Sequence, residues 1–157
     1  MDERDLKAHL LGRVLEYGGG WNAVERDIYE KFQQEDEELR QKYPGGEYNY
    51  AQRTDWFALF AERISPLFDA CCTDKKRVYG GKSSRSFGFP AKFAGIEQPA
   101  ATEVTLKTKS RAEVHVTTET DMEDEYLFVL LKKGNAWKID SYKGRTRGDE
   151  KWQNMLL

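Results

Sequence analysis

A few side chains of this sequence are of the types that carry acid–base chemistry. Asp55 stands directly before Trp56, and Asp140 lies in a stretch where apolar and polar residues alternate. A carboxyl group beside apolar side chains can serve as a general acid or base, because loss of solvent favours its protonated form. Both residues also have simple structural explanations: Asp55 fits the start of a helix, and Asp140 fits one half of a cross-strand ion pair.

Other residues suited to catalysis or metal binding are few. His9 falls among charged residues of a predicted helix, and His115 stands mid-strand beside Glu113, so exposure to solvent explains either imidazole. The adjacent Cys71 and Cys72 would close a strained ring, so we expect two reduced thiols in or beside a core helix. These residue types nowhere have the spacing of a metal site, and no cofactor is expected.

Two charged regions are prominent. One is a run of four acids, which fits a solvated helix face or a surface that meets a basic partner: Glu35, Asp36, Glu37 and Glu38. The other, residues 75–92, combines basic residues with Phe87 and Phe89. This pattern is found in single-stranded nucleic-acid binding and also in solvated loops whose phenylalanines close a core. The formal net charge of −2 favours the loop, and nucleic acid is not expected as a partner.

The bulk composition fits one soluble domain. The 157 residues are 39% apolar, 33% charged and 13% aromatic, which provides enough apolar material for a core. No segment approaches the roughly 20 apolar residues of a membrane span, and the acidic start is unlike a secretory signal. Together with reduced thiols, these features predict a cytoplasmic protein that does not enter a membrane.

The first part of the chain predicts two helices. Residues 2–16 have apolar side chains at helical spacing, and glycines 18–20 would end that helix. Asn22 followed by Glu25 has the pattern of an N-cap with its capping-box partner. This pair predicts the start of a second helix that runs to about residue 42.

Two shorter helices and a long connection should follow. Residues 50–64 predict a third helix, and Ser65-Pro66 would restart a fourth, with serine as N-cap and proline in the first turn. Residues 73–98 are interrupted by glycines and prolines. We therefore expect a long connection that covers an opening of the core, with one short strand at 77–79.

In the last third, the apolar residues recur at every second position, which indicates strands. Lys109-Ser110 and Gly134-Asn135 have the residue types of tight turns between them. Helices first and a meander of at least four antiparallel strands second predict an α+β fold. We assign the chain to a single domain, 1–157, with an additional N-terminal helix at 1–20, helices at 21–73, a curved sheet at 74–145 and a tail at 146–157.

The two faces of the predicted sheet should differ. The side chains expected to face the helices are Val114, Val116, Trp137 and Ile139. Those expected on the outer face are Glu113, His115, Lys138, Asp140 and Tyr142. The strand at 126–131 is apolar on both sides, which an antiparallel sheet with a solvated outer face does not need. We therefore expect the outer face to be partly covered, by a partner or by the C-terminal residues from Trp152 onward.

The order of elements resembles the nuclear transport factor 2-like fold, a cystatin-like roll in which helices pack into a curved antiparallel sheet to form a cone. Within that fold, three stretches resemble the immunity proteins of bacterial polymorphic toxin systems: residues 85–90 (RSFGFP), 111–114 (RAEV) and 126–141 (YLFVLLKKGNAWKIDS). The last stretch, with a Lys-Gly turn before Trp-Lys-Ile, also resembles the wider fold. The likeness covers about residues 50–145.

This resemblance implies a protein that is not an enzyme and that neutralises a cognate toxin by tight stoichiometric binding. Such a complex needs a buried anchor cluster with a charged rim. If the toxin is a nuclease, the acids at 35–38 would mimic phosphate. The partner-binding candidates are these four acids together with His115, Asp140 and Tyr142, and the outer sheet face is also a candidate for a homodimer.

Two other functions are open. A small-molecule binder, or an isomerase- or dehydratase-like enzyme of the same fold, would use the cone as an apolar pocket. Its pocket candidates are Asp55 as the acid, Trp56 as a wall, and Phe87 and Phe89. A structural or dimerisation module would instead join a larger assembly through the outer sheet face. A pocket that holds Asp55 would favour the first of these, and a filled cone would favour a binding protein or module.

Overall fold

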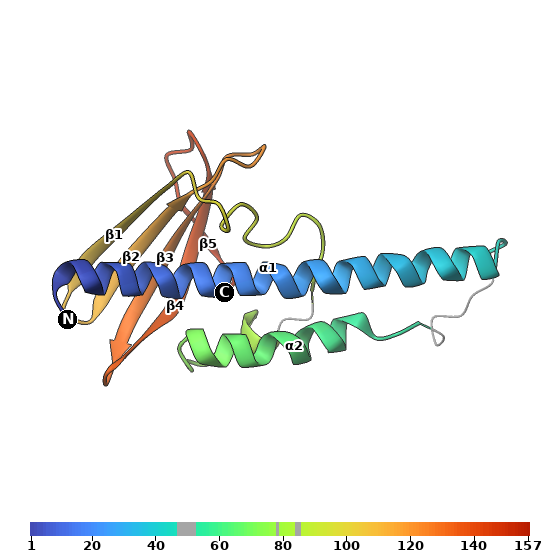
Figure 1. Cartoon of the computed structure of the whole chain (residues 1–157), viewed down its shortest axis with the longest axis horizontal. Coiled ribbons are helices and arrows are strands. Elements are labelled where there is room, and N and C mark those ends of the chain that lie inside the picture. Colours follow the sequence, from blue (N-terminus) through green and yellow to red (C-terminus); the bar gives the residue numbers. More distant parts are fainter. Residues whose placement is uncertain (47–52, 78, 84–85) are drawn as a thin grey trace.

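The computed structural model describes residues 1–46, 53–77, 79–83 and 86–157. Two α-helices precede a five-stranded antiparallel sheet whose strands are neighbours in chain order. Figure 1 shows α1 crossing the sheet and continuing well beyond it, with α2 alongside. The predicted α+β class, with helices first and a sheet second, is confirmed.

The helix α1 (Glu3–Lys42) runs unbroken through 40 residues. Asp2 caps its start, because its carboxylate accepts a hydrogen bond from the amide of Asp5 at 2.8 Å. The predicted break at glycines 18–20, with an additional helix before it, is wrong. The first half of α1 is part of the core, where its buried side chains include Leu10, Val14, Tyr17 and Trp21.

The glycines of α1 permit close packing instead of ending the helix. A β-carbon on Gly18 would lie 2.4 Å from the side chain of Ile96, and one on Gly20 would lie 3.0 Å from that of Leu67. Ile96 belongs to the connection after α2, and Leu67 belongs to α2 itself. Both elements therefore pack directly against the backbone of α1, which larger residues at these positions would prevent.

The helix α2 (Trp56–Cys71) begins after Asp55, which accepts a hydrogen bond from the amide of Ala58 as N-cap. The predicted restart at Ser65-Pro66 is wrong, since the helix continues through both residues. The Ser65 hydroxyl donates to a backbone carbonyl one turn earlier, and the proline ring is exposed. Residues 50–52, where a helix was predicted to start, lie outside the described part of the chain.

The sheet is a simple meander. Its strands are β1 (Ala101–Thr108), β2 (Arg111–Thr117), β3 (Asp124–Lys133), β4 (Ala136–Thr146) and β5 (Gln153–Met155). Both predicted tight turns are present, between β1 and β2 and between β3 and β4. The C-terminal segment, predicted as a tail, adds β5 through pairing with β4.

A β-bulge in β4 changes which of its side chains face the helices. Consecutive residues of β3 pair with Ser141 and then with Ile139, so Asp140 is left over between them. The alternation shifts by one residue, and Tyr142 joins Ile139 on the inner face, opposite Phe128. Tyr142 is 3% exposed. Its predicted place on the outer face is therefore wrong.

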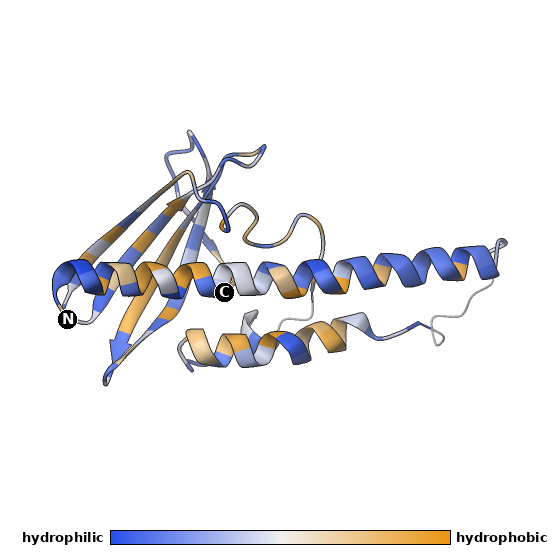
Figure 2. Ribbon diagram, in the orientation of Figure 1, coloured by the Kyte–Doolittle hydropathy of each residue, from blue (hydrophilic) through white to orange (hydrophobic). Residues whose placement is uncertain are grey.

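The core lies between the inner face of the sheet and the helices. Figure 2 shows apolar residues along the strands and the first half of α1, whereas the far half of α1 is mostly hydrophilic. The largest fully buried side chains are Trp21, Tyr17, Phe60, Phe93 and Phe128. Cys71 and Cys72 are buried free thiols, as predicted, and burial raises the pKa of Cys72 to about 12.

The connection between α2 and β1 closes one end of the core. Among its described residues, regular structure is limited to the 3-10 helix η2 (Gly81–Ser83). Phe93 and Ile96 are fully buried, so this segment covers the core opening as predicted. The predicted strand at 77–79 includes Val78, which lies outside the described residues; its two neighbours are not in a strand.

Candidate functional site

A cavity of about 930 Å³ opens between α1, residues 86–94 and the ends of β3, β4 and β5. Aromatic residues from four of these elements line it: Trp21, Phe87, Tyr126 and Tyr142. Residues of the segment before η2 and of the C-terminus line it as well: Tyr79, Gly80, Met155 and Leu156. The cavity therefore marks the open end of the cone that the helices and the curved sheet form.

Two buried polar side chains of α1 hold the loop that forms one wall. Asn22 accepts a hydrogen bond from the Phe93 amide at 2.9 Å and donates to the Phe93 carbonyl at 2.7 Å. The Glu25 carboxylate accepts from the amides of Lys92 and Gly88, at 2.7 and 2.9 Å, and from an indole N–H of α1 at 3.2 Å. The sequence predicted this pair as a helix cap, but both residues lie within the helix and satisfy the loop backbone instead.

Lys92 brings a positive charge into the cavity. Its Nζ atom lies 4.4 Å from the ring centroid of Trp21, 5.4 Å from that of Phe93 and 5.6 Å from that of Tyr142. Among the described residues, no ion pair or hydrogen bond reaches Nζ. Burial lowers the pKa of Lys92 to about 8, and the negative charge of Glu25 opposes this change.

Two tyrosines complete the interior of the cavity. The Tyr126 hydroxyl donates to the Ala94 carbonyl at 2.8 Å, and the Tyr142 ring stacks on Phe128 with centroids 5.5 Å apart. Within the described chain, no hydrogen bond engages the Tyr142 hydroxyl. Burial raises the pKa of Tyr142, so this hydroxyl stays protonated and can donate. The cavity thus presents two available donors, the Lys92 ammonium and the Tyr142 hydroxyl.

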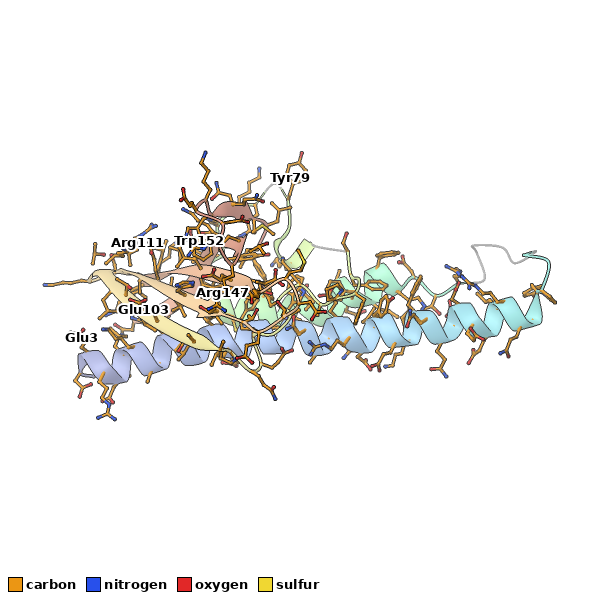
Figure 3. All side chains as sticks on the ribbon, turned by 90° about the horizontal axis from the view of Figure 1, so that it is seen from above. Glu3, Tyr79, Glu103, Arg111, Arg147 and Trp152 are labelled. Carbon is orange, nitrogen blue, oxygen red and sulfur yellow. The ribbon has the colours of Figure 1, made fainter. Side chains whose placement is uncertain are left out.

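A second charged cluster lies on the outer face of the sheet. The buried Glu125 carboxylate forms hydrogen bonds with His115 Nε2 at 2.7 Å and with Arg145 at 3.4 Å. Burial alone would raise the pKa of Glu125, but these hydrogen bonds outweigh it and hold the pKa below its usual range. The Trp152 ring lies 4.1 Å from the Arg145 guanidinium and 5.3 Å from the His115 ring, on the side of the sheet away from α1 (Figure 3). The C-terminal segment therefore covers part of the outer face, which is one of the two covers that the sequence predicted.

The predicted acidic run does not form one uniform surface. Glu35 accepts hydrogen bonds from the amide and the hydroxyl of Thr54, at 2.8 and 2.6 Å. Asp36 pairs with two arginines, one on α1 and one on the segment before α2. These two acids hold that segment against α1, whereas Glu37 and Glu38 are exposed.

Asp140 has a local structural role. Its carboxylate accepts hydrogen bonds from Lys75 Nζ at 2.8 Å and from the Thr73 hydroxyl at 2.9 Å. Burial would raise the pKa of Asp140, but these hydrogen bonds outweigh it and lower the pKa. The bulge that leaves Asp140 unpaired in the ladder thus lets it fasten the segment after α2 to the sheet.

Of the four predicted pocket residues, the cavity takes in Phe87 and leaves out the other three. Asp55 is an exposed N-cap, Trp56 is half-buried beside it, and Phe89 is 77% exposed. The pocket role predicted for Asp55 is wrong in position. Glu35 holds the start of α2 against α1, about ten residues or roughly 15 Å beyond the part of α1 that lines the cavity.

The sequence did not indicate Lys92 and Glu25 as site residues. Lys92 was grouped with the basic residues of its loop, and Glu25 with a helix cap. One signal was available: Lys92 lies within Pro-Ala-Lys-Phe-Ala, an apolar setting in which a fully solvated lysine is not expected.

Two further properties concern the described residues alone. Within residues 1–46, 53–77, 79–83 and 86–157, no three histidine, cysteine or acidic side chains come together as metal ligands. In the same ranges, neither helix combines the length and the apolarity that a bilayer crossing requires.

Comparisons with known proteins give two matches. A family model described as "NTF2 fold immunity protein" matches residues 38–155. "Immunity protein RhsIA" of Dickeya dadantii (strain 3937) is 27% identical over 92 residues, which cover 58% of this chain and 65% of that protein, just under two thirds of its length. No solved structure gives a significant match. Most of α1 precedes the residues that match the family model, although its first half supplies much of the core.

Proposed function

The chain belongs to the family of NTF2-fold immunity proteins, and from this we propose that it neutralises a cognate bacterial toxin by binding it in a stoichiometric complex. The match over residues 38–155 carries this proposal, and it confirms the resemblance that residues 85–90, 111–114 and 126–141 predicted. The relative from Dickeya dadantii is also named an immunity protein, which supports the same function.

We propose that the protein acts by binding and not as an enzyme. Two of the four acids that line the cavity have their oxygens engaged: Glu25 accepts three N–H hydrogen bonds, and Glu125 forms two. For Glu125 these hydrogen bonds outweigh the effect of burial and hold the pKa below its usual range, which makes this carboxylate a poor proton carrier.

For the charged rim of the complex, we propose the acidic end of α1. Glu37 and Glu38 are exposed there, and they suit a toxin with a basic face, such as a nuclease. Glu35 and Asp36 would support this rim by fixing the adjacent segment. His115 and Asp140 are also proposed contacts, through the parts of their side chains that stay exposed.

The outer face of the sheet is proposed as the surface for a homodimer. Leu127 and Leu131 are half-buried there, and Trp152 covers a different part of the face. The buried thiols Cys71 and Cys72 fit the proposed place of action, a reducing cytoplasm. A single mass equal to one chain at all concentrations in sedimentation experiments would contradict the homodimer.

The decisive experiment pairs this chain with its cognate toxin domain, sought first among the genes beside its own. Co-expression should restore growth that the toxin alone abolishes, and the purified pair should elute as one complex of fixed stoichiometry that survives high salt. A non-cognate toxin domain is the control and should give neither result. If an active cognate toxin gives no complex and no protection, the proposed function is wrong.

A further inference from the structure

Exposed apolar residues gather at the mouth of the cavity. Tyr79 is 72% exposed, Leu156 is 58% exposed and Met155 is 45% exposed, and all three line the cavity. Figure 3 shows Tyr79 projecting away from the body of the fold. Phe89, which is 77% exposed, directly precedes the cavity residue Pro90. Large apolar side chains from separate segments around one opening mark a surface that another molecule covers.

No carboxylate of the described chain lies within ion-pair distance of the Lys92 ammonium, although Glu25 acts on its charge at longer range and Asp124, Glu125 and Asp149 also line the cavity. The oxygens of Glu25 are engaged by three N–H donors, and Glu125 is engaged by His115 and Arg145. Lys92 faces aromatic rings that include Tyr142, and the Tyr142 hydroxyl is a second donor without an acceptor in the described chain. Two donors in one cavity are complementary to a carboxylate, which accepts at both oxygens.

Resting on the proposed function, we propose that the cavity is the docking site for the toxin and receives a toxin segment in which an acidic side chain, flanked by apolar residues, pairs with Lys92. The apolar flanks would cover the exposed rim, and the carboxylate would reach the interior. This arrangement matches the anchor-and-rim organisation of tight protein interfaces.

The rim favours a chain segment over a free carboxylate as the occupant. A small carboxylate would satisfy Lys92 and Tyr142 but would leave Tyr79 and Leu156 exposed. A segment of a protein partner covers both the interior and the rim. Rim variants should weaken the binding of a protein segment but not of a small carboxylate, so mutation can distinguish the two occupants.

The test measures the affinity of the purified chain for the cognate toxin domain by calorimetry. Lys92→Met retains the apolar stem and removes the charge, and we expect it to weaken binding by about 30-fold or more, as loss of one partner of a buried charge pair does. The matched control is Lys109→Met in the exposed β1–β2 turn, for which we expect a change within about twofold. A rim variant, Tyr79→Ser with Leu156→Ser, should weaken binding by about tenfold. Both side chains are exposed, so this variant should leave the core unchanged.

The outcomes separate the two proposals. If the wild-type chain binds the toxin and both the Lys92 and the rim variants bind equally well while folded by circular dichroism, the docking inference alone is wrong. If the wild-type chain does not bind, the proposed function fails and the inference fails with it. Phenylacetate serves as the free-carboxylate probe: micromolar binding that leaves the toxin affinity unchanged would assign the cavity to a small molecule and overturn the inference. Rescue of Lys92→Glu by an acid-to-lysine variant of the toxin would identify the partner carboxylate and support it.

Discussion

The acidic end of α1 and the cavity at the open end of the sheet are both charged, but their charges have different surroundings. At the end of α1, Glu35 and Asp36 contact the segment before α2 and help to hold it in place. In the cavity, Lys92 contacts aromatic rings, and no anion pairs with it in the described chain. Half of the acidic run thus has a structural role, whereas Lys92 has ring contacts but no direct ion pair within the described chain.

The largest effect should come from the carboxylate that builds the cavity wall. Glu25→Ala would leave two loop amides and an indole N–H without an acceptor, in a position where Glu25 is 4% exposed. We expect a loss of about 3 kcal/mol in the free energy of unfolding, measured by urea denaturation. Glu119→Ala, an exposed acid in the β2–β3 turn, should show almost no change. An equal stability of both variants would mean that Glu25 does not organise this wall.

The second predicted effect is an increase in stability. Lys92→Met should stabilise the chain at pH 7 by about 2 kcal/mol, because the buried ammonium costs free energy, part of which its ring contacts return. The variant that is expected to lose toxin binding should therefore be the more stable protein, which would show that the charge is kept for function.

The pH dependence of this difference provides its control. The pKa of Lys92 is about 8 in the folded chain and 10.5 when unperturbed, so below pH 8 both states are charged and the cost is fully present. Between pH 8 and 10.5 the folded state releases its proton first, so the wild-type chain gains stability relative to Lys92→Met as the pH rises. Glu25, Cys72 and Tyr142 face Lys92 and are present in both proteins. A difference in unfolding free energy that stays constant from pH 7 to 10.5 would contradict this account.

A smaller loss of stability is expected at the acidic end of α1. Asp36 and Arg53 have side chains that are 20% and 18% exposed, so their ion pair is only partly screened by solvent. Asp36→Ala should lower the free energy of unfolding by about 1 kcal/mol, whereas Glu37→Ala beside it should change it by less than about 0.5 kcal/mol. Equal values for the two neighbours would show that the run acts as one solvated surface, as its sequence alone suggests.

The sheet was predictable because the alternation of apolar and polar residues along each strand shows which side chains face the core and which face outward. The alternation around Val114 and Val116 depends on neighbours two residues away, and the turns depend on local residue types. The shift at Asp140 was not predictable in this way. A bulge depends on how two strands pair, and alternation within β4 does not reveal the residue that is left over.

The predictions of a helix break and of the pocket residues failed for a related reason. Gly18 has a packing role that depends on Ile96, far along the chain, so its local reading as a terminator was incomplete. Lys92 gains its surroundings from Trp21 on α1 and Tyr142 on β4, which the fold alone brings together. Local patterns predicted the elements, but not the contacts between elements that define the site.

The smallest predicted effect concerns the exposed acids of the proposed rim. Neutralising both, with Glu37→Gln and Glu38→Gln, should slow association with a basic toxin by several-fold and leave dissociation nearly unchanged, because exposed charges act mainly on encounter. Surface plasmon resonance at low salt would measure both rates, and the difference should fade near physiological ionic strength, where the Debye length is about 8 Å.

Glu119→Gln with Asp121→Asn removes two exposed acids between β2 and β3, which is the same change in charge, and is the matched control for net charge. If this control slows association as much as the variant of Glu37 and Glu38, the effect reflects the overall charge of the chain and not the end of α1. If the variant of Glu37 and Glu38 instead speeds dissociation by about tenfold, these acids lie inside the interface. The anchor would then be at the end of α1, and the roles assigned to the two regions would be reversed.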